Sequence, residues 1–386
     1  MPVIPYSCQN ITDDDIAAVE AVLRSEYLTQ GPAVPAFEAV FAQRHGVAYA
    51  VAVSNATAGL HIGCLALGAG PGKTVWTSPN SFLASANCAL YCGASIDFVD
   101  IDPVTRNLSI VALSAKLKAA ERDGRLPAIV IPVDFGGLPC DLREMRGLAD
   151  RYGFRILQDA SHSTGASYLG QPVGSAYADI SVFSFHAVKI VTTAEGGMVA
   201  TQDPQLARQL ALLRSHGMSR DPAEMDGPAE GLWYYQQQLL GFNYRMTDMQ
   251  AALGLSQFQR LEYLQSRREV LAARYDEMLA DLPLLRPARL PDRNSAWHLY
   301  PVEIDEHRTP RRRDKVFLAL REAGIGVNVH YIPIHTQPFY ARLGFQPGYC
   351  PAAEHYYARA LSIPLFPALS DAQQDQVVAT LRSALA

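Results

Sequence analysis

The stretch between residues 47 and 201 repeats one alternation that constrains the fold more than any other feature of the sequence. Seven short apolar runs, each of strand length, are separated by amphipathic segments such as TAGLHIGCLALG and LREMRGLADRYG. This alternation is typical of a largely parallel sheet with helices on both faces. The sequence therefore predicts an α/β architecture. The runs are VAYAVAV (47–53), TVWTSP (74–79), SIDFVDI (95–101), PAIVIPV (127–133), FRILQD (154–159), DISVFSF (179–185) and GGMVAT (196–201).

The chain is long enough to hold more than one core. It has 386 residues, of which 49% are hydrophobic, and single cores stop growing at roughly 250–300 residues. From residue 246, long helical periodicity replaces the alternation, followed by two expected strands, AWHLYPVEI (296–304) and GIGVNVHYI (324–332), and a final helix near 370–385. We therefore expect a large domain at 1–245 and a smaller C-terminal α/β domain at 246–386.

Charge and composition exclude several classes of partner. The formal net charge is −5 and no long block of like charge occurs, so neither nucleic acid nor an anionic membrane is expected as the main partner. The N-terminal MPVIPYSCQN lacks the pattern of a signal peptide, and no apolar run reaches the ~18 residues of a membrane span. The six cysteines are scattered without a C-x-x-C pair, as is typical of reduced thiols. We expect a cytoplasmic protein with a small-molecule ligand.

Two familiar site patterns are incomplete. GAGPGKT (68–74) resembles a phosphate-binding P-loop, but Leu67 stands where the first glycine is required, and the segment precedes a predicted strand. His330 and His335 lie in HYIPIH without an H-E-x-x-H helix or a cysteine pair, so no metal site is expected. A tight turn and the polar edge of a cleft are the better interpretations of these segments.

The ends of the predicted strands carry side chains that fit one cofactor. In open α/β sheets, ligands bind outside the carboxyl ends of the strands. Lys189 is one of only five lysines in the chain and follows the run that ends at residue 185, while Asp159 ends the run FRILQD. Pyridoxal phosphate needs a lysine for its aldehyde and a carboxylate that keeps its pyridine nitrogen protonated. Lys189 and Asp159 are the predicted lysine and carboxylate.

Other strand ends can supply the remaining contacts of this cofactor. Residues 54–58 lead into a predicted helix whose N-terminal N–H groups suit a phosphate, to which Thr57 and Ser184 add hydroxyls. Phe82 offers a flat apolar face to the ring, and His162 offers a hydrogen-bond donor to its phenolic oxygen. Each residue type is common at a strand end, so the prediction depends on their occurring together.

Five motifs follow one another in a characteristic order: SNAT (54–57), QDASH (158–162), SFHAVK (184–189), EGG (195–197) and NYRM (243–246). In this order the chain resembles the DegT-type sugar-nucleotide aminotransferases. The resemblance runs nearly end to end and includes YSCQNITDDDIAAVEAVLRSEYLTQGP near the N-terminus, RSHGMSR and HYIPIHTQPFY.

The resemblance implies a homodimer with shared active sites and the aspartate-aminotransferase fold (type I) of pyridoxal-phosphate enzymes. That fold has a mostly parallel seven-stranded sheet in its large domain. By this resemblance Lys189 would form the Schiff base, Asp159 would pair with the pyridine nitrogen, and His162 would lie near the phenolic oxygen. The residues implied to hold the phosphate are Ala56, Thr57, Ser184 and Asn243 of the partner subunit.

The substrates implied by the resemblance are L-glutamate, as the amino donor, and a nucleotide-linked keto sugar. Three arginines, Arg214, Arg220 and Arg245, are candidates for binding the diphosphate because guanidinium groups pair well with phosphate. The residues expected to line the sugar-nucleotide site are Tyr6, Leu28, Thr29, Gln30, Gly31, His330 and Tyr331, with the adjoining Ile332 and Pro333.

Within this family the LTQGP and SFH-x-VK-x-x-TT patterns are most similar to the pseudaminic acid branch. That branch makes UDP-4-amino-4,6-dideoxy-N-acetyl-β-L-altrosamine from a UDP-linked 4-keto sugar. Ala187, Ala194, Gln158 and Asp134 depart from the residues common at these positions, and Asp134 is a candidate to face the substrate. Two alternatives stay open, an aminotransferase for another 3- or 4-keto nucleotide sugar and a non-catalytic regulator on the same fold. Lys189 argues against a dehydratase of this fold, in which histidine replaces the lysine.

Overall fold

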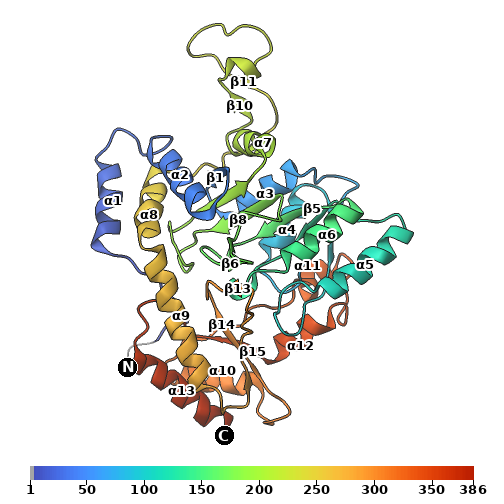
Figure 1. Cartoon of the computed structure of the whole chain (residues 1–386), viewed down its shortest axis with the longest axis vertical. Helices are drawn as coiled ribbons and strands as arrows, with labels where there is room; N and C mark the ends of the chain where they lie inside the picture. The colour runs from blue at the N-terminus through green and yellow to red at the C-terminus, as the bar shows by residue number, and fades with distance from the viewer. Residues whose placement is uncertain (1–3) are drawn as a thin grey trace.

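The computed structural model describes residues 4–386 and is built around one seven-stranded sheet (Figure 1). The strand order is β1-β9-β8-β5-β4-β2-β3, and β9 runs antiparallel to both of its neighbours. The other neighbouring pairs are parallel, so the predicted mostly parallel seven-stranded sheet is confirmed. Its strands are β1 (Tyr49–Val53), β2 (Thr74–Thr77), β3 (Ser95–Phe98), β4 (Ile129–Ile131), β5 (Arg155–Asp159), β8 (Ile180–Ser184) and β9 (Gly197–Thr201).

Successive side chains of these strands point to opposite faces of the sheet, and each face has its own helices. On one face Val51, Val53 and Ile129 pack with α3, α4 and α7. On the other face Ala52 packs with α2 and α8, and Val130 packs with α5 and α6. The helices are α1 (Asp13–Leu23), α2 (Ala33–His45), α3 (Ala56–Ala66), α4 (Ala84–Tyr91), α5 (Ile110–Arg122), α6 (Leu142–Tyr152), α7 (Pro204–Arg214) and α8 (Asp248–Gln259).

A second core lies in the C-terminal part of the chain, in the lower half of Figure 1. Its sheet has the order β12-β14-β15 and is antiparallel. Ile4, close to the N-terminus, packs into this core. The elements are α9 (Leu261–Met278), β12 (Leu284–Leu285), β14 (Tyr300–Ile304), α10 (Arg313–Glu322), α11 (Pro338–Ala341), α12 (Pro351–Arg359), β15 (Ala360–Ile363) and α13 (Asp371–Leu385).

The side chains of α9 belong to two different cores. Leu261 and Leu264 pack with α2 and α8 against the large sheet, whereas Leu271 packs in the second core. The change from one core to the other therefore falls within α9. The division of the chain into domains at 1–245 and 246–386 stays a prediction.

Two expectations for the C-terminal part have different outcomes. The final helix near 370–385 is present as α13. The strand expected at 324–332 is wrong, because Ile325 and Asn328 form only isolated bridges, with Ile4 and Ser362. The physical reason is that the segment changes partner within three residues, from Ile4 to Ser362 on the free edge of β15, so no continuous ladder forms.

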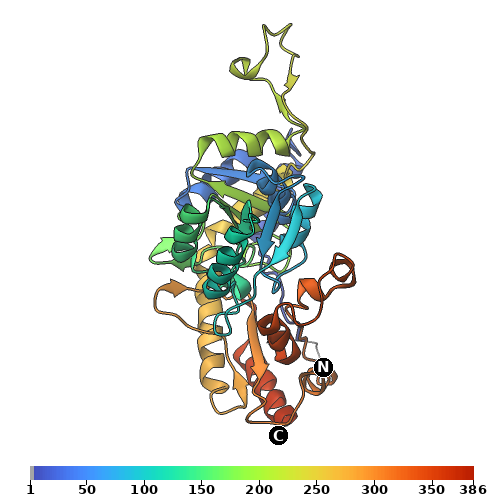
Figure 2. The same ribbon diagram turned by 90° about the vertical axis from the view of Figure 1, so that its right-hand side faces the viewer.

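A hairpin projects from the body of the molecule near α7 (Figures 1 and 2). Its base is formed by β10 (Met218–Ser219) and β11 (Gln236–Gln237), which pair antiparallel. A separate small sheet has the order β13-β6-β7, with β6 (Ser167–Tyr168), β7 (Gln171–Pro172) and β13 (Arg293–Asn294). Within residues 4–386, none of the helices has the length and apolar character needed to cross a membrane.

Candidate active site

A cavity of about 810 Å³ opens where the carboxyl ends of β5 and β8 meet the first turn of α3. Its volume lies within the ~300–1,000 Å³ of small-molecule sites. The segment around residues 328–331 and the N-terminal Tyr6 complete its wall. Ten of the residues predicted from the sequence line it: Tyr6, Ala56, Thr57, Phe82, Asp159, His162, Ser184, Lys189, His330 and Tyr331.

The first turn of α3 presents backbone N–H groups at one end of this cavity. Asn55 caps the helix, and its Oδ1 accepts a hydrogen bond from the N–H of Ala58 at 2.8 Å. The N–H groups at the start of a helix carry a partial positive charge and suit an anion. Gly197 lies so close to this turn that an added Cβ would approach the Ala56 nitrogen to 2.8 Å. The close packing of β9 against the turn therefore requires glycine at that position.

The carboxylate of Asp159 is held by two hydrogen bonds at the end of β5. The hydroxyl of Ser85 donates to Oδ2 at 2.6 Å, and the N–H of Ser161 donates to Oδ1 at 3.1 Å. The hydroxyls of Ser81 and Ser85 lie 2.7 Å apart, and Ser81 itself lines the cavity. Two donors, one on each oxygen, fix the orientation of this buried carboxylate.

The amine of Lys189 shares this cavity with Asp159. A tight turn joins β8 to Lys189. In this turn the backbone N–H of Lys189 donates to the carbonyl of His186 at 2.9 Å. Burial lowers the pKa of Lys189 to about 8, and the negative charge of Asp159 opposes this shift. A larger share of neutral amine makes the lysine a better nucleophile near neutral pH.

A cluster of aromatic and imidazole rings forms the opposite wall. The imidazole of His162 is hydrogen-bonded on both nitrogens, to the Gly136 N–H and to the hydroxyl of Tyr331, each at 3.2 Å. The His298 ring lies 4.4 Å from that of His162 and also lines the cavity. Burial, with the charge of Lys189, lowers the pKa of His162 well below its ordinary value. A neutral imidazole at this place can hold or donate a proton without adding charge.

The comparison with known proteins decides what this site belongs to. The sequence profile of the DegT/DnrJ/EryC1/StrS aminotransferase family matches residues 9–382. The chain belongs to this family. It is therefore a sugar aminotransferase that depends on pyridoxal phosphate, as the resemblance of the motifs predicted.

Relatives of this DegT-family enzyme match it along nearly the whole chain. The spore coat polysaccharide biosynthesis protein SpsC of Bacillus subtilis is 39% identical over 382 residues, which is 98% of this chain and 96% of SpsC. Helicobacter pylori PseC, an aminotransferase involved in the biosynthesis of pseudoaminic acid, has a TM-score of 0.91 at 29% identity, covering 99% of each chain. DesV of S. venezuelae, solved with a ketimine intermediate, has a TM-score of 0.89 at 31% identity, covering 99% of this chain and 98% of DesV.

The residues of the DegT-family enzyme fit its cofactor. The cavity holds a nucleophilic amine, a carboxylate with two donors, and a helix N-terminus beside the hydroxyls of Thr57 and Ser184. These are the groups that an aldehyde, a pyridine nitrogen and a phosphate require. Phe82 leaves 60% of its surface exposed, and its ring lines the same cavity.

Several predicted site residues lie outside the cavity of this one chain. The guanidinium of Arg214 pairs with Glu38 at 2.5 Å and also donates to the carbonyl of Ala52 at 3.0 Å. The N–H of Gly31 donates to Asp248. The roles of the residues outside the cavity stay predictions. They are Leu28, Thr29, Gln30, Gly31, Arg214, Asn243, Ile332 and Pro333.

The expectation that Asp134 faces the substrate is wrong. Its side chain is fully buried and accepts hydrogen bonds from Ser163 at 2.6 Å and from Gln158 at 2.8 Å. Burial raises the pKa of Asp134 to about 6, although the hydrogen bonds from Ser163 and Cys140 lower it. The amide of Gln158 gives this buried carboxylate a donor, which a glutamate at that position would not do when ionised.

Among the residues at the site that sequence reasoning missed are Ser85 and His298. Ser85 lies in the first turn of α4, and its place three residues after the predicted Phe82 was the available signal for it. His298 lies at the end of a segment that enters β14, inside the run AWHLYPVEI, where it reads as an ordinary strand residue. Neither residue lies next to a motif that carries the chemistry.

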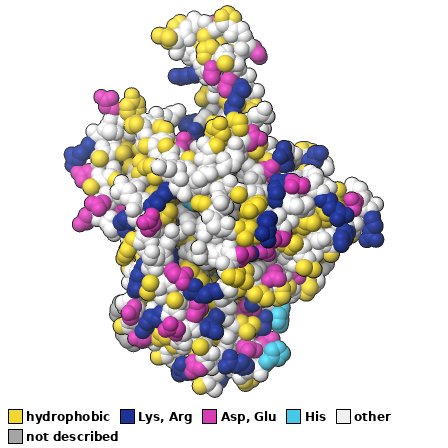
Figure 3. Space-filling model, viewed as in Figure 1, with side chains coloured by type: hydrophobic (Ala, Val, Ile, Leu, Met, Phe, Trp, Pro, Cys, Tyr) yellow, Lys and Arg dark blue, Asp and Glu magenta, His cyan; other side chains and the backbone are white. Residues whose placement is uncertain are grey.

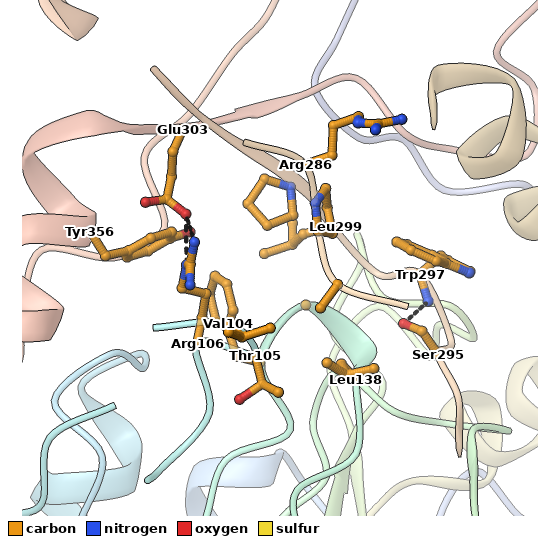
Figure 4. Close-up of a pocket in the computed structure, with 15 residues that line it drawn as sticks. Val104, Thr105, Arg106, Leu138, Arg286, Ser295, Trp297, Leu299, Glu303 and Tyr356 are labelled. Carbon is orange, nitrogen blue, oxygen red and sulfur yellow. Dashed lines mark hydrogen bonds and ion pairs between the residues drawn. The ribbon is translucent and has the colours of Figure 1, made fainter. Parts of the chain in front are cut away.

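A second cavity, of about 30 Å³, lies where the segment around Arg106 meets β14 (Figure 4). Arg106 is ion-paired with Glu303, which also accepts from Arg359 at 2.9 Å. The guanidinium of Arg106 lies over the Tyr356 ring, 5.5 Å from its centroid. This cavity has room for about one water molecule, so it is too small for a substrate.

Proposed function

We propose that the enzyme transfers the amino group of L-glutamate to C4 of a UDP-linked 4-keto-6-deoxy-N-acetylhexosamine. The product would be UDP-4-amino-4,6-dideoxy-N-acetyl-β-L-altrosamine. The observation that carries the proposal is the convergence of Lys189, Asp159 and the α3 N-terminus on one cavity of about 810 Å³. Such a cavity has room for the cofactor and a sugar ring together.

When bound, pyridoxal phosphate supplies an electron sink for the carbon that carries the amino group. Lys189 Nζ would form the covalent bond to it and would be displaced by the amino group of glutamate. The freed Nζ would then move the proton from the α-carbon of the donor, for which its pKa of about 8 is suited. Asp159 would keep the ring nitrogen protonated.

A homodimer with shared sites is part of the proposal. The projecting hairpin exposes apolar side chains, of which Leu232 is 100% and Trp233 73% exposed, and Figure 3 shows hydrophobic atoms on it. Exposed apolar patches of this kind mark interaction surfaces. Asn243 is exposed close to the base of the hairpin, paired by a bridge with Ser215. A second copy would cover the hairpin and receive Asn243 at its phosphate.

The choice of substrate rests on similarity and on the shape of the wall. PseC of Helicobacter pylori takes part in the biosynthesis of pseudoaminic acid, and its fold matches along 99% of both chains. The cavity wall offers Tyr6 and Tyr331, which have flat faces and hydroxyls suited to a sugar. Neither feature separates UDP from dTDP. One methyl group on the base discriminates by only about 1–3 kcal/mol, so we expect a preference between the two nucleotides.

The experiment is to incubate the purified enzyme with glutamate and a panel of UDP-, dTDP- and GDP-linked 4-keto sugars and to identify products by mass. We expect the highest kcat/KM with the UDP-linked N-acetylated sugar. An equal or higher kcat/KM for dTDP-4-keto-6-deoxyglucose would overturn this substrate and favour another nucleotide sugar. No turnover with any sugar, together with no binding of cofactor, would favour the non-catalytic regulator.

A further inference from the structure

We propose that Tyr331 donates its hydroxyl proton to an oxygen atom of the bound ligand, held in that direction by a hydrogen-bond chain from Gly136 through His162. The identity of the ligand rests on the proposed function. The direction of the hydrogen-bond chain rests on the structure, because its first bond has one possible donor and that bond fixes the tautomer of His162.

The hydrogen-bond chain begins at a backbone group that can only donate. The N–H of Gly136 lies 3.2 Å from Nδ1 of His162. A backbone N–H has no lone pair to offer, so Nδ1 must accept and therefore carries no proton. In a neutral imidazole the single proton then lies on Nε2.

The turn that carries Gly136 is fixed by close packing. Gly137 has φ +103°, and an added Cβ would approach the Trp297 nitrogen to 2.9 Å and the carbonyl oxygen of His162 to 3.0 Å. Only glycine allows this turn to lie against both segments. The Gly136 N–H is thereby held at the edge of the His162 ring.

His162 stays neutral in this environment. Its side chain is 5% exposed, and the positive charge of Lys189 adds to the effect of burial in lowering its pKa. The neighbouring His298, whose Nδ1 is buried without a hydrogen-bond partner in the part of the chain that the structure describes, also has a pKa well below the ordinary value. The Nε2 proton of His162 is therefore present as a donor without a net charge.

The next bond in the chain fixes the hydroxyl of Tyr331. His162 Nε2 lies 3.2 Å from this oxygen and donates to it. Burial raises the pKa of Tyr331, and the charge of Asp159 adds to the rise, so the phenol keeps its proton. His162 is the one hydrogen-bond partner of this oxygen within residues 4–386. Tyr331 lines the cavity, so its proton is free for a ligand there.

The acceptor is an oxygen that carries or gains negative charge. Two oxygens of the proposed reaction have this chemistry, the phenolic oxygen of the cofactor and the carbonyl oxygen of the sugar. A neutral donor that is already oriented stabilises such an oxygen without a cost of reorganisation. The two acceptors give different results in the experiment below.

The first measurement tests the chain without any turnover. Nitrogen-15 NMR of histidine-labelled, cofactor-loaded enzyme, with the His162 signals assigned by loss in His162→Gln, should show Nδ1 unprotonated and Nε2 protonated. A proton on Nδ1 would overturn the proposal. This result is independent of the substrate, so it separates failure of the chain from failure of the proposed function.

The second measurement compares Tyr331→Phe, which removes only the hydroxyl, with Tyr152→Phe. Tyr152 lies on α6 and has a buried hydroxyl without a partner among residues 4–386, so its loss should leave the kinetics unchanged. If the phenolic oxygen is the acceptor, Tyr331→Phe shifts the pH at which the absorbance of the bound cofactor changes. If the sugar carbonyl is the acceptor, single turnover with the keto sugar slows by about 10- to 100-fold, while the half-reaction with glutamate does not. Tyr331→Phe with neither effect would overturn the proposal.

Discussion

Ser85 donates its hydroxyl proton to Oδ2 of Asp159 across 2.6 Å, although the two residues are 74 positions apart in the sequence. The bond joins α4, which packs on one face of the sheet, to the carboxyl end of β5. It leaves Oδ1 with the Ser161 N–H, so each carboxylate oxygen has a fixed donor. The orientation of the proposed partner of the ring nitrogen therefore depends on a helix that carries no recognisable motif.

We predict that Asp159→Asn binds the cofactor and transaminates orders of magnitude more slowly, because an amide cannot keep the ring nitrogen protonated. Ser85→Ala should lower kcat by about 10-fold, the effect of losing one hydrogen bond to a charged group. Both are measured as kcat under saturating substrates. The control is Asp150→Asn, at a side chain that is 68% exposed on α6. Near-normal turnover of Asp159→Asn would assign this residue a structural role only.

Lys189 should be the only site of covalent cofactor attachment. The pure protein should be yellow, and reduction with borohydride should remove the absorbance band and leave a pyridoxyl group on Lys189, found by peptide mapping. Lys189→Ala should bind the cofactor only reversibly. Lys73→Ala is the matched control, because Lys73 is an exposed lysine in the turn before β2. A label on Lys73 would contradict the assignment.

The pH dependence of cofactor attachment follows from the pKa of Lys189. This pKa is lowered from 10.5 to about 8 by burial, and only the neutral amine attacks an aldehyde. The rate of attachment to the apo-enzyme should therefore rise with pH and level off above about 8, as followed by absorbance in stopped flow. A rate that keeps rising beyond pH 10 would show that Lys189 has an ordinary pKa.

Mixed dimers test the sharing of active sites. A Lys189→Ala chain and an Asn243→Ala chain should each be poorly active alone. Mixing them should restore about one intact site per heterodimer, because one of the two sites then receives both native residues. Activity is measured after subunit exchange, which is followed with differently tagged chains. Exchange without recovery of activity would place Asn243 in the site of its own chain or in none.

In two places the sequence pattern did not predict how a segment pairs or where a side chain lies. The run at 324–332 has the apolar character of a strand, yet its pairing is limited to isolated bridges at Ile325 and Asn328. A strand needs one partner over several residues, whereas this segment bridges first to Ile4 and then to Ser362 on the edge of β15. Similarly, the polar Asp134 at a strand end was expected in the cavity, and it is instead buried against Ser163 and Gln158.

The sequence by itself determined the seven strands of the large sheet and the positions of Lys189 and Asp159 at strand ends. These are local properties, because consecutive residues set both the spacing of the apolar side chains and the position where a strand ends. Only the tertiary structure decided that Ser85 orients Asp159 and that Gly136 fixes the proton of His162. Hydrogen bonds of this kind join segments far apart in the chain, so their partners exist only once the strand ends have packed together.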